Sequence, residues 1–273
     1  MSKKKTISRR LRAGSFTAFA LASSAAWADH SPALDPVSIW IGGYYANAEA
    51  SLGAKTPVGN VSTGALDLQD GDETVGRARL DLLFFDTQGF TFDYYTLSHS
   101  STDTLTQPFN FGGVPFELNS TLKGKLDFSA GSASWHWWLD AGDDVFGIGL
   151  GATYYRAKLD IAGTIALNGE TSAASVHSDE DAVAPLLTLA YKHAFSDSFR
   201  FYIDASGVRK SGGNLTGHIY DARAGLEWFP WHNVGVGAEY GDTRIRLDRE
   251  SQNYDAKLDL KLHGPSLFAR FRF

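Results

Sequence analysis

The chain has 273 residues, of which 43% are hydrophobic, 25 are Lys or Arg and 31 are Asp or Glu, and it contains no cysteine. The lack of cysteine excludes disulfides and thiolate metal sites, and the acidic balance disfavours nucleic-acid binding, which needs a basic surface. Beyond the N-terminal segment no apolar run approaches the roughly 18 residues of a membrane-spanning helix, which excludes a helical membrane protein.

Residues 1–28 have the features of a signal peptide. Six basic residues precede an apolar run from Ala13 to Ala22, and the small-residue pattern Ala26-Trp27-Ala28 follows. We predict export and cleavage after Ala28, which leaves residues 29–273 as a single domain with 19 basic and 31 acidic side chains. The pair Arg9-Arg10 is also compatible with a twin-arginine signal. That route exports folded proteins, whereas the membrane barrel that the rest of the chain predicts must reach its membrane unfolded.

Apolar and polar residues alternate with a period of two through most of the remaining chain. In the segments 90–95 and 199–206, every second side chain is apolar and most of the others are polar. This pattern indicates β-strands with one apolar face. We predict an all-β fold, a single antiparallel transmembrane β-barrel of ten strands, with eight or twelve strands as alternatives and a soluble β-sandwich as the competing fold. The ten predicted strands are 37–54, 74–85, 90–104, 120–139, 145–165, 182–195, 199–210, 215–229, 234–249 and 255–273.

The predicted connections differ in length. Those at 86–89, 140–144, 196–198 and 230–233 are short, and those at 55–73, 105–119 and 166–181 are long, as expected for periplasmic turns and outer loops. The second long connection carries an apolar patch that we expect to pack on the barrel rim, to fold inward or to meet a partner: Phe109, Phe111, Val114 and Phe116. Aromatic residues near the short turns predict a girdle at the membrane interface: Trp40, Phe84, Phe90, Trp138, Phe146, Phe195, Phe199, Trp228, Phe229, Trp231, Phe271 and Phe273.

Two glycine-containing segments, Gly149–Tyr155 and Gly235–Gly241, resemble each other. Their glycines fall on one face, so we predict a lumen side without side chains there, which leaves room for long side chains opposite. The alternation slips after the tyrosine in both segments. That slip predicts either a β-bulge or a strand that rises above the bilayer.

The C-terminal strand carries a family resemblance. Gly264–Phe273 places Leu267, Ala269, Phe271 and Phe273 on one face and ends in an aromatic residue. This strand resembles the C-terminal assembly signal of Gram-negative outer-membrane barrels, and the chain after the signal peptide is similar in pattern to small OmpA-like and OmpW-like barrels. The resemblance implies an outer-membrane location, recognition by the barrel-assembly machinery, and contact with outer-membrane lipid and lipopolysaccharide.

Projecting the alternation inward predicts a charged lumen. A near balance of acids and bases favours an ion-pair network that fills a narrow barrel, because buried charges must be paired. The alternative is a constricted pore whose charges select solutes. The predicted network comprises Arg77, Arg79, Asp81, Asp93, Lys123, Lys125, Asp127, Arg200, Asp204, Asp221, Arg223, Glu227 and Glu239, and the same face carries Glu49, Lys192, Arg270 and Arg272.

We therefore predict a structural or surface role, or a narrow passive channel, without enzymatic activity, metal or cofactor. The competing class is an outer-membrane hydrolase. Ten strands is also the size of the omptin proteases, and His99-Ser100-Ser101 has the His-x-Ser form of lipid A deacylases. Under that alternative the candidate groups at the outer rim are Asp67, Asp70, Asp72, Glu73, His99, Asp103, His177, Asp179, Glu180 and Asp181.

Overall fold

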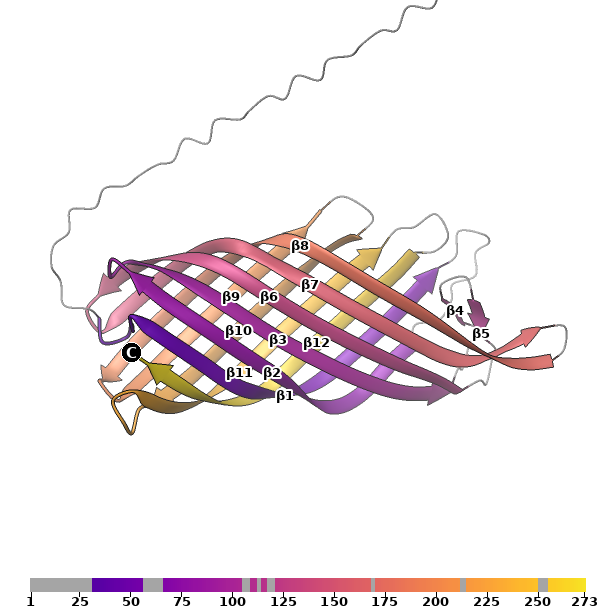
Figure 1. The fold of residues 1–273 in the computed structure, drawn as a ribbon, viewed down its shortest axis with the longest axis horizontal. Helices are drawn as coiled ribbons and strands as arrows, with labels where there is room; N and C mark the ends of the chain where they lie inside the picture. Colours follow the sequence, from indigo (N-terminus) through magenta and orange to yellow (C-terminus); the bar gives the residue numbers. More distant parts are fainter. Residues whose placement is uncertain are drawn as a thin grey trace, which may run out of the picture.

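The structure is a computed structural model that describes residues 31–55, 66–104, 109–111, 114–116, 121–167, 170–211, 215–249 and 255–273. Ten long strands form one closed antiparallel barrel, and two short strands form a separate hairpin (Figure 1). The predicted fold class and strand number are confirmed. The signal peptide lies outside the described residues. The barrel strands are β1 (Val37–Lys55), β2 (Leu66–Phe84), β3 (Gln88–Thr104), β6 (Thr121–Ala141), β7 (Asp144–Leu167), β8 (Glu170–Ser196), β9 (Phe199–Lys210), β10 (Leu215–Trp228), β11 (Val234–Arg249) and β12 (Asp255–Arg272), and the small hairpin is β4 (Phe109–Phe111) with β5 (Val114–Phe116).

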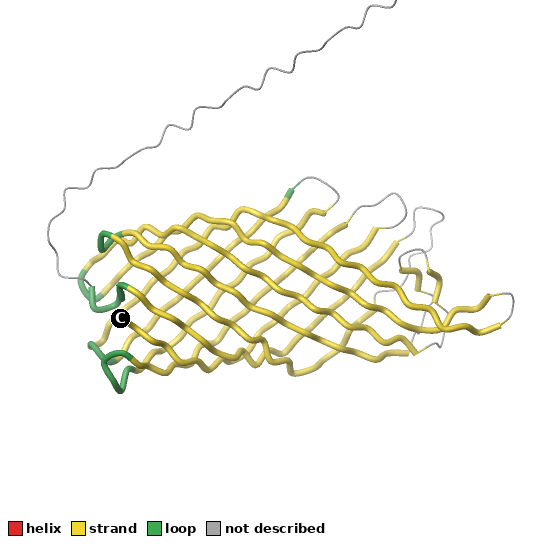
Figure 2. The backbone as a smooth tube through the Cα atoms, viewed as in Figure 1, coloured by secondary structure: helices red, strands yellow, loops and turns green. Residues whose placement is uncertain are grey.

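The barrel closes between its first and last strands. Neighbours follow the order β1-β12-β11-β10-β9-β8-β7-β6-β3-β2, and β1 pairs with both β12 and β2. The β1–β12 pairing runs from Ser38↔Arg272 to Lys55↔Asp255. Figure 2 shows the resulting lattice of tilted strands. A closed sheet satisfies its backbone hydrogen bonds internally, which is the condition for a sheet to sit in lipid. Among the described residues, no helix is long and apolar enough to cross a membrane.

The two ends of the barrel differ, and we name them the turn end and the hairpin end. The turn end holds the C-terminus and the short connections at 85–87, 142–143, 197–198 and 229–233 (Figure 1). Phe85, Asp86 and Gly142 have φ of 55°, 60° and 81°, the left-handed backbone that tight turns use. At the hairpin end, β7 and β8 extend beyond the other strands (Figure 1).

Two strands begin at least eight residues earlier than the sequence predicts. β2 begins at Leu66 instead of residue 74, and β8 begins at Glu170 instead of residue 182. The long connection predicted at 166–181 is therefore wrong, because β7 and β8 stay paired up to Leu167↔Glu170. Residues 170–181 are mostly small or polar, so they lack the apolar alternation, yet backbone pairing does not require it. The predicted apolar patch falls on the β4–β5 hairpin, where Phe109 pairs with Phe116.

The outer surface of the turn-end half is apolar and is bounded by aromatic residues. The aromatic ring predicted at the turn end includes outward-facing side chains that are at least 38% exposed: Phe84, Phe146, Phe195, Phe199, Trp228, Trp231 and Phe273. Trp40, Trp138 and Phe229, expected in the same ring, are instead buried and face the lumen.

A second, outward-facing ring of tyrosines lies nearer the hairpin end and is 46–56% exposed: Tyr45, Tyr94, Tyr154, Tyr220 and Tyr240. On β7 the two rings are eight residues apart, from Phe146 to Tyr154. At about 3.3 Å per residue and a tilt near 40°, this spacing corresponds to roughly 20 Å, close to the thickness of a transmembrane barrel's apolar band.

Beyond the tyrosine ring, toward the hairpin end, the alternation inverts. On β6, Leu122, Leu126 and Phe128 are buried and face inward, while Lys123 and Lys125 point outward and are exposed. A strand in lipid turns its apolar side out, but a strand in water turns its apolar side in. The hairpin-end half therefore follows the pattern of a water-exposed barrel.

The inverted half builds a layer of apolar side chains across the lumen. Every one of the ten barrel strands contributes a buried side chain to this single cluster, which we call the apolar layer. Its members are Tyr44, Val75, Leu97, Phe128, Ala130, Tyr155, Ala184, Leu186, Val208, Ile219, Ile245, Leu260 and Leu262.

The glycines of the two similar segments face the lumen, as predicted. A Cβ at Gly149 would lie 2.2 Å from Thr188 Oγ1, and one at Gly237 would lie 2.2 Å from the ring of Phe268. Large side chains of neighbouring strands thus cross over these glycines. The predicted bulge after the tyrosine is absent from both segments, because the pairing of β7 and of β11 continues without a shift. The apparent slip marks the point where the strand leaves the apolar band.

Candidate functional site

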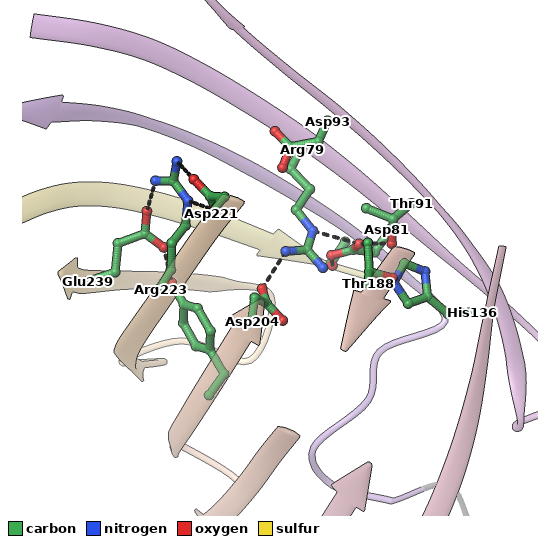
Figure 3. Close-up of polar contacts among 12 residues, drawn as sticks. Arg79, Asp81, Thr91, Asp93, His136, Thr188, Asp204, Asp221, Arg223 and Glu239 are labelled. Atoms are coloured by element: carbon green, nitrogen blue, oxygen red, sulfur yellow. Dashed lines mark hydrogen bonds and ion pairs between the residues drawn. The ribbon is translucent and has the colours of Figure 1, made fainter. Parts of the chain in front are cut away.

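The candidate site is a network of ion pairs in the lumen, on the turn-end side of the apolar layer. Its central link is Arg79 on β2, which donates hydrogen bonds to Asp81 at 2.9 Å and to Asp204 at 2.6 Å (Figure 3). β2 and β9, which carries Asp204, are five strands apart in the ring of ten and so lie opposite each other. The side chains of Arg79 and Asp204 together therefore bridge the lumen. Thr91 donates a further hydrogen bond to Asp81 at 2.7 Å.

A second cluster surrounds Glu239 on β11. Its carboxylate accepts hydrogen bonds from Arg223 at 3.1 Å, from Arg77 at 3.2 Å and from the hydroxyl of Tyr202. Tyr202 reaches Glu239 by crossing over β10 at Gly225, where a Cβ would lie 2.6 Å from the tyrosine ring. Arg223 also binds Asp221 through two nitrogens at 2.7 and 2.8 Å, as Figure 3 shows. Arg77 in turn holds Asp93 on the adjacent strand.

A third cluster lies toward the turn end, around Arg270 on β12. Arg270 pairs with Glu227 and donates a hydrogen bond to Ser38 at 2.9 Å. It also lies 3.7 Å from Asp81, which links this cluster to Arg79. The first and third clusters are thus linked through Asp81, and the second lies beside the first around one shared cavity.

A small cavity lies between the network and the apolar layer. Its volume is about 80 Å³, and its lining includes Arg79, Asp204 and Asp221 on one side and Tyr155 on the other. His136 also lines it and contacts Thr188 at 2.8 Å, across the bare backbone of Gly149 (Figure 3). The polar lining and the size suit a few water molecules. The apolar layer borders this cavity, and its described members are at most 8% exposed.

The structure brings most of the predicted network residues together. The inward-facing members are Arg77, Arg79, Asp81, Asp93, Arg200, Asp204, Asp221, Arg223, Glu227 and Glu239, together with Lys192, Arg270 and Arg272.

Four predicted lumen residues point outward instead: Lys123, Lys125, Asp127 and Glu49. Lys125 pairs with Asp127 at 2.9 Å, and Ser98 donates to Asp127, both on the outer wall. Glu49 pairs with Lys261 at 3.2 Å and is 52% exposed at its side chain. The prediction of an inward position for these four residues is wrong, since it assumed apolar-out alternation over the whole strand, and these residues lie in the inverted half.

Sequence reasoning missed two contributors. The first is the apolar layer. Its residues are of the same apolar types as the lipid-facing ones, and they differ only in occupying the alternate positions of each strand, which face the lumen. The second is Asp35, which precedes the first strand and pairs with lumen arginines. The lumen described here carries seven basic side chains against six acidic ones from the strands, and Asp35 supplies the seventh acid.

The candidate hydrolase residues are dispersed. His99 faces the lumen and is buried, whereas His177 lies on β8 outside the barrel and contacts Asp160 at 2.6 Å. Asp179 pairs with Arg156 at 2.7 Å on the same outer surface. Glu180 and Asp181 also lie on β8 instead of in a loop. The structure does not describe the side chains of the remaining candidates, which are Asp67, Asp70, Asp72, Glu73 and Asp103.

The fold resembles solved outer-membrane barrels. The outer membrane protease OmpT from Escherichia coli aligns with a TM-score of 0.58 at 10% identity, covering 87% of this chain and 96% of OmpT. OprG from Pseudomonas aeruginosa aligns at 0.44 and 11% identity over 89% of this chain and all (100%) of that one, and Ail from Yersinia pestis at 0.30 and 14% identity over 88% and 100%. No protein-family model and no curated protein sequence matches the chain. The chain has the fold of an outer-membrane β-barrel protein.

Proposed function

We propose that the protein is an integral outer-membrane barrel with a closed lumen, which serves a structural or surface role and does not pass solutes. The observation that carries this proposal is the apolar layer, to which all ten strands contribute. A packed apolar constriction excludes water and therefore ions. The ion-pair network occupies the lumen on the turn-end side of this layer. A solute would therefore have to pass both the ion-pair network and the apolar layer.

The proposed orientation places the turn end in the periplasm and the hairpin end outside the cell. β7 continues for 13 residues beyond Tyr154. At about 3.3 Å per residue and a tilt near 40°, this length raises the end of the β7–β8 hairpin roughly 30 Å above the apolar band. Outward-facing ion pairs cover this part, including Arg156 with Asp179. A surface of this kind suits contact with lipopolysaccharide head groups and with molecules outside the cell.

We also propose that the last strand is the segment read by the barrel-assembly machinery. Its alternate side chains point outward, with Leu267 72% and Phe273 65% exposed and with Ala269 and Phe271 between them. Removing Phe273 should lower the amount of heat-modifiable barrel in the outer membrane, whereas Phe85→Ser, at an exposed turn, should not. Equal assembly of both variants would contradict this assignment.

A narrow pore and a hydrolase are the alternatives. The pore would need a path through the apolar layer, and the lumen cavity beside that layer has a volume of only about 80 Å³. A hydrolase has the fold shared with OmpT in its favour, but the described histidines of the rim lie apart, His99 inside the wall and His177 outside it.

Liposome swelling separates the closed barrel from the pore. Refolded protein, verified as a heat-modifiable band on gel electrophoresis, is placed in vesicles and exposed to small sugars and amino acids. The proposal predicts swelling no faster than in protein-free vesicles. Swelling that depends on solute size and on the amount of folded protein would establish a pore in its place.

A further inference from the structure

The segment Ser31–Pro36, which precedes β1, lies at the turn end of the barrel and is bonded to it at several points. Ser31 Oγ donates to the carbonyl of Gly142 at 2.6 Å, and the carbonyl of Pro36 accepts from the Leu83 amide at 2.8 Å. Each contact reaches a different part of the wall. The segment thus crosses the mouth of the barrel instead of leaving it directly.

Two apolar side chains of the segment enter the lumen. Ala33 and Leu34 are 1% and 7% exposed, and they pack in one cluster with Trp138, Val145 and Ala194 from β6, β7 and β8. This burial covers the lumen side chains nearest the turn end. An ordinary leader to a first strand would leave such side chains in water.

Asp35 provides the polar half of the attachment. Arg200 donates to both carboxylate oxygens, at 2.7 and 2.9 Å, in the bidentate geometry that arginine uses for carboxylates. Arg270 lies 3.6 Å and Arg272 3.9 Å from the same carboxylate. Asp35 and Arg200 are both nearly buried, with side chains 6% and 5% exposed. Three cations from β9 and β12 therefore converge on one anion of the segment.

We propose that Ser31–Pro36 is a separable plug, and that Arg200, Arg270 and Arg272 form a carboxylate-binding site in the mouth of the barrel, which Asp35 occupies. The plug closes the mouth on the turn-end side of the ion-pair network. It also neutralises the lumen, because the strands there carry one more basic than acidic side chain. With the plug displaced, the mouth becomes an open basic vestibule that accepts a carboxylate from elsewhere.

Cysteine labelling tests the plug, since the chain has no cysteine of its own. Ala194→Cys, 3% exposed beneath the plug, reports on the mouth. Thr87→Cys, at an exposed turn, is the accessible control, and Ala130→Cys, 1% exposed in the apolar layer, reports on unfolding. Each is reacted with a membrane-impermeant maleimide in the full chain, in Asp35→Asn, and after deletion of residues 31–35.

The proposal predicts that Ala194→Cys reacts slowly in the full chain and about tenfold faster or more in Asp35→Asn and in the deletion. Thr87→Cys should react in every protein and Ala130→Cys in none. Labelling of Ala130→Cys in the deletion would show that the segment is needed for folding and is not separable. Unchanged labelling of Ala194→Cys after deletion would show that the segment does not close the mouth.

A peptide tests the binding site itself. The deletion protein carrying Ala194→Cys is incubated with a capped peptide of residues 31–36, Ser-Pro-Ala-Leu-Asp-Pro, or with the same peptide containing Asn in place of Asp. The site predicts protection from labelling by the Asp peptide only. Equal protection by both peptides, or protection by neither, would overturn the carboxylate site.

Discussion

Arg79 on β2 and Asp204 on β9 meet across the lumen at 2.6 Å, although their strands lie on opposite sides of the ring. Both side chains are mostly buried, at 13% and 18% exposure. A single ion pair thus joins opposite walls of the barrel. The two side chains occupy the lumen between these strands at that level.

Breaking this pair should destabilise the barrel. In Arg79→Ala, the carboxylates of Asp81 and Asp204 lose their shared partner, at a cost of about 3 kcal/mol, the lower end of the range for buried pairs, because the adjoining cavity admits water. The free energy of unfolding in urea measures the loss. Replacing both partners, as in Arg79→Met with Asp204→Leu, should cost less than Arg79→Ala. If Arg79→Ala were as stable as the parent protein, the Arg79–Asp204 pair would not contribute to the stability of the barrel.

The bare backbone at Gly149 should be essential to the network. A Cβ there would lie 2.2 Å from Thr188 Oγ1 and 2.7 Å from His136, so Gly149→Ala forces both side chains to move, at a cost of about 1–3 kcal/mol. Gly76 is the matched control, since a Cβ there has no described neighbour within 4 Å. The midpoint of heat modifiability compares the two variants. If Gly76→Ala lowers the midpoint more than Gly149→Ala does, the close approach of Thr188 and His136 over Gly149 is not essential to the packing.

The inversion of the alternation predicts opposite effects for two neighbours on β6. Phe128 is 2% exposed within the apolar layer, so Phe128→Ala should cost about 3–5 kcal/mol. Asp127 points outward, with its side chain 37% exposed, so Asp127→Ala should change stability by less than about 1 kcal/mol. Urea unfolding of both variants measures the difference. Similar losses would mean that Asp127 shares the lumen after all.

The sequence predicts the wall of this barrel better than its contents. Within the apolar band, lipid imposes one rule on every strand, and the alternation of residues 90–95 and 199–206 therefore identified both the strands and the inward charges. Outside the band, water surrounds the strand, and the same residue types exchange faces without changing the period. Lys123, Lys125 and Asp127 were misplaced for this reason. The start of β8 was mispredicted for a different reason. Residues 170–181 pair with β7 through the backbone and are mostly small or polar, so their sequence shows no apolar alternation. Asp35 was missed because a plug is defined by tertiary contacts alone.

Stability should depend on pH through Asp35. Burial alone would raise the pKa of Asp35, but the hydrogen bond from Arg200 and the charges of Arg270 and Arg200 outweigh it and lower the pKa below the usual 3.8. A carboxyl with a lowered pKa stabilises the folded state fully above its unfolded value, and this contribution disappears as the pH falls through the folded value. The parent should therefore be more stable than Asp35→Asn at pH 6, and the difference should shrink below pH 3.8. A difference independent of pH would exclude the carboxylate as its source.

Conductance across a planar bilayer shows whether the lumen is closed. Folded parent protein, confirmed as heat-modifiable, is inserted into a bilayer between salt solutions, and the current is recorded at voltages of both signs. Because the apolar layer and the ion-pair network lie in series, the parent should give no steady channel current. Phe128→Ala, which thins the apolar layer, should at most add brief, small openings. Stable and sizeable channels from the parent protein would contradict the closed lumen and establish a pore.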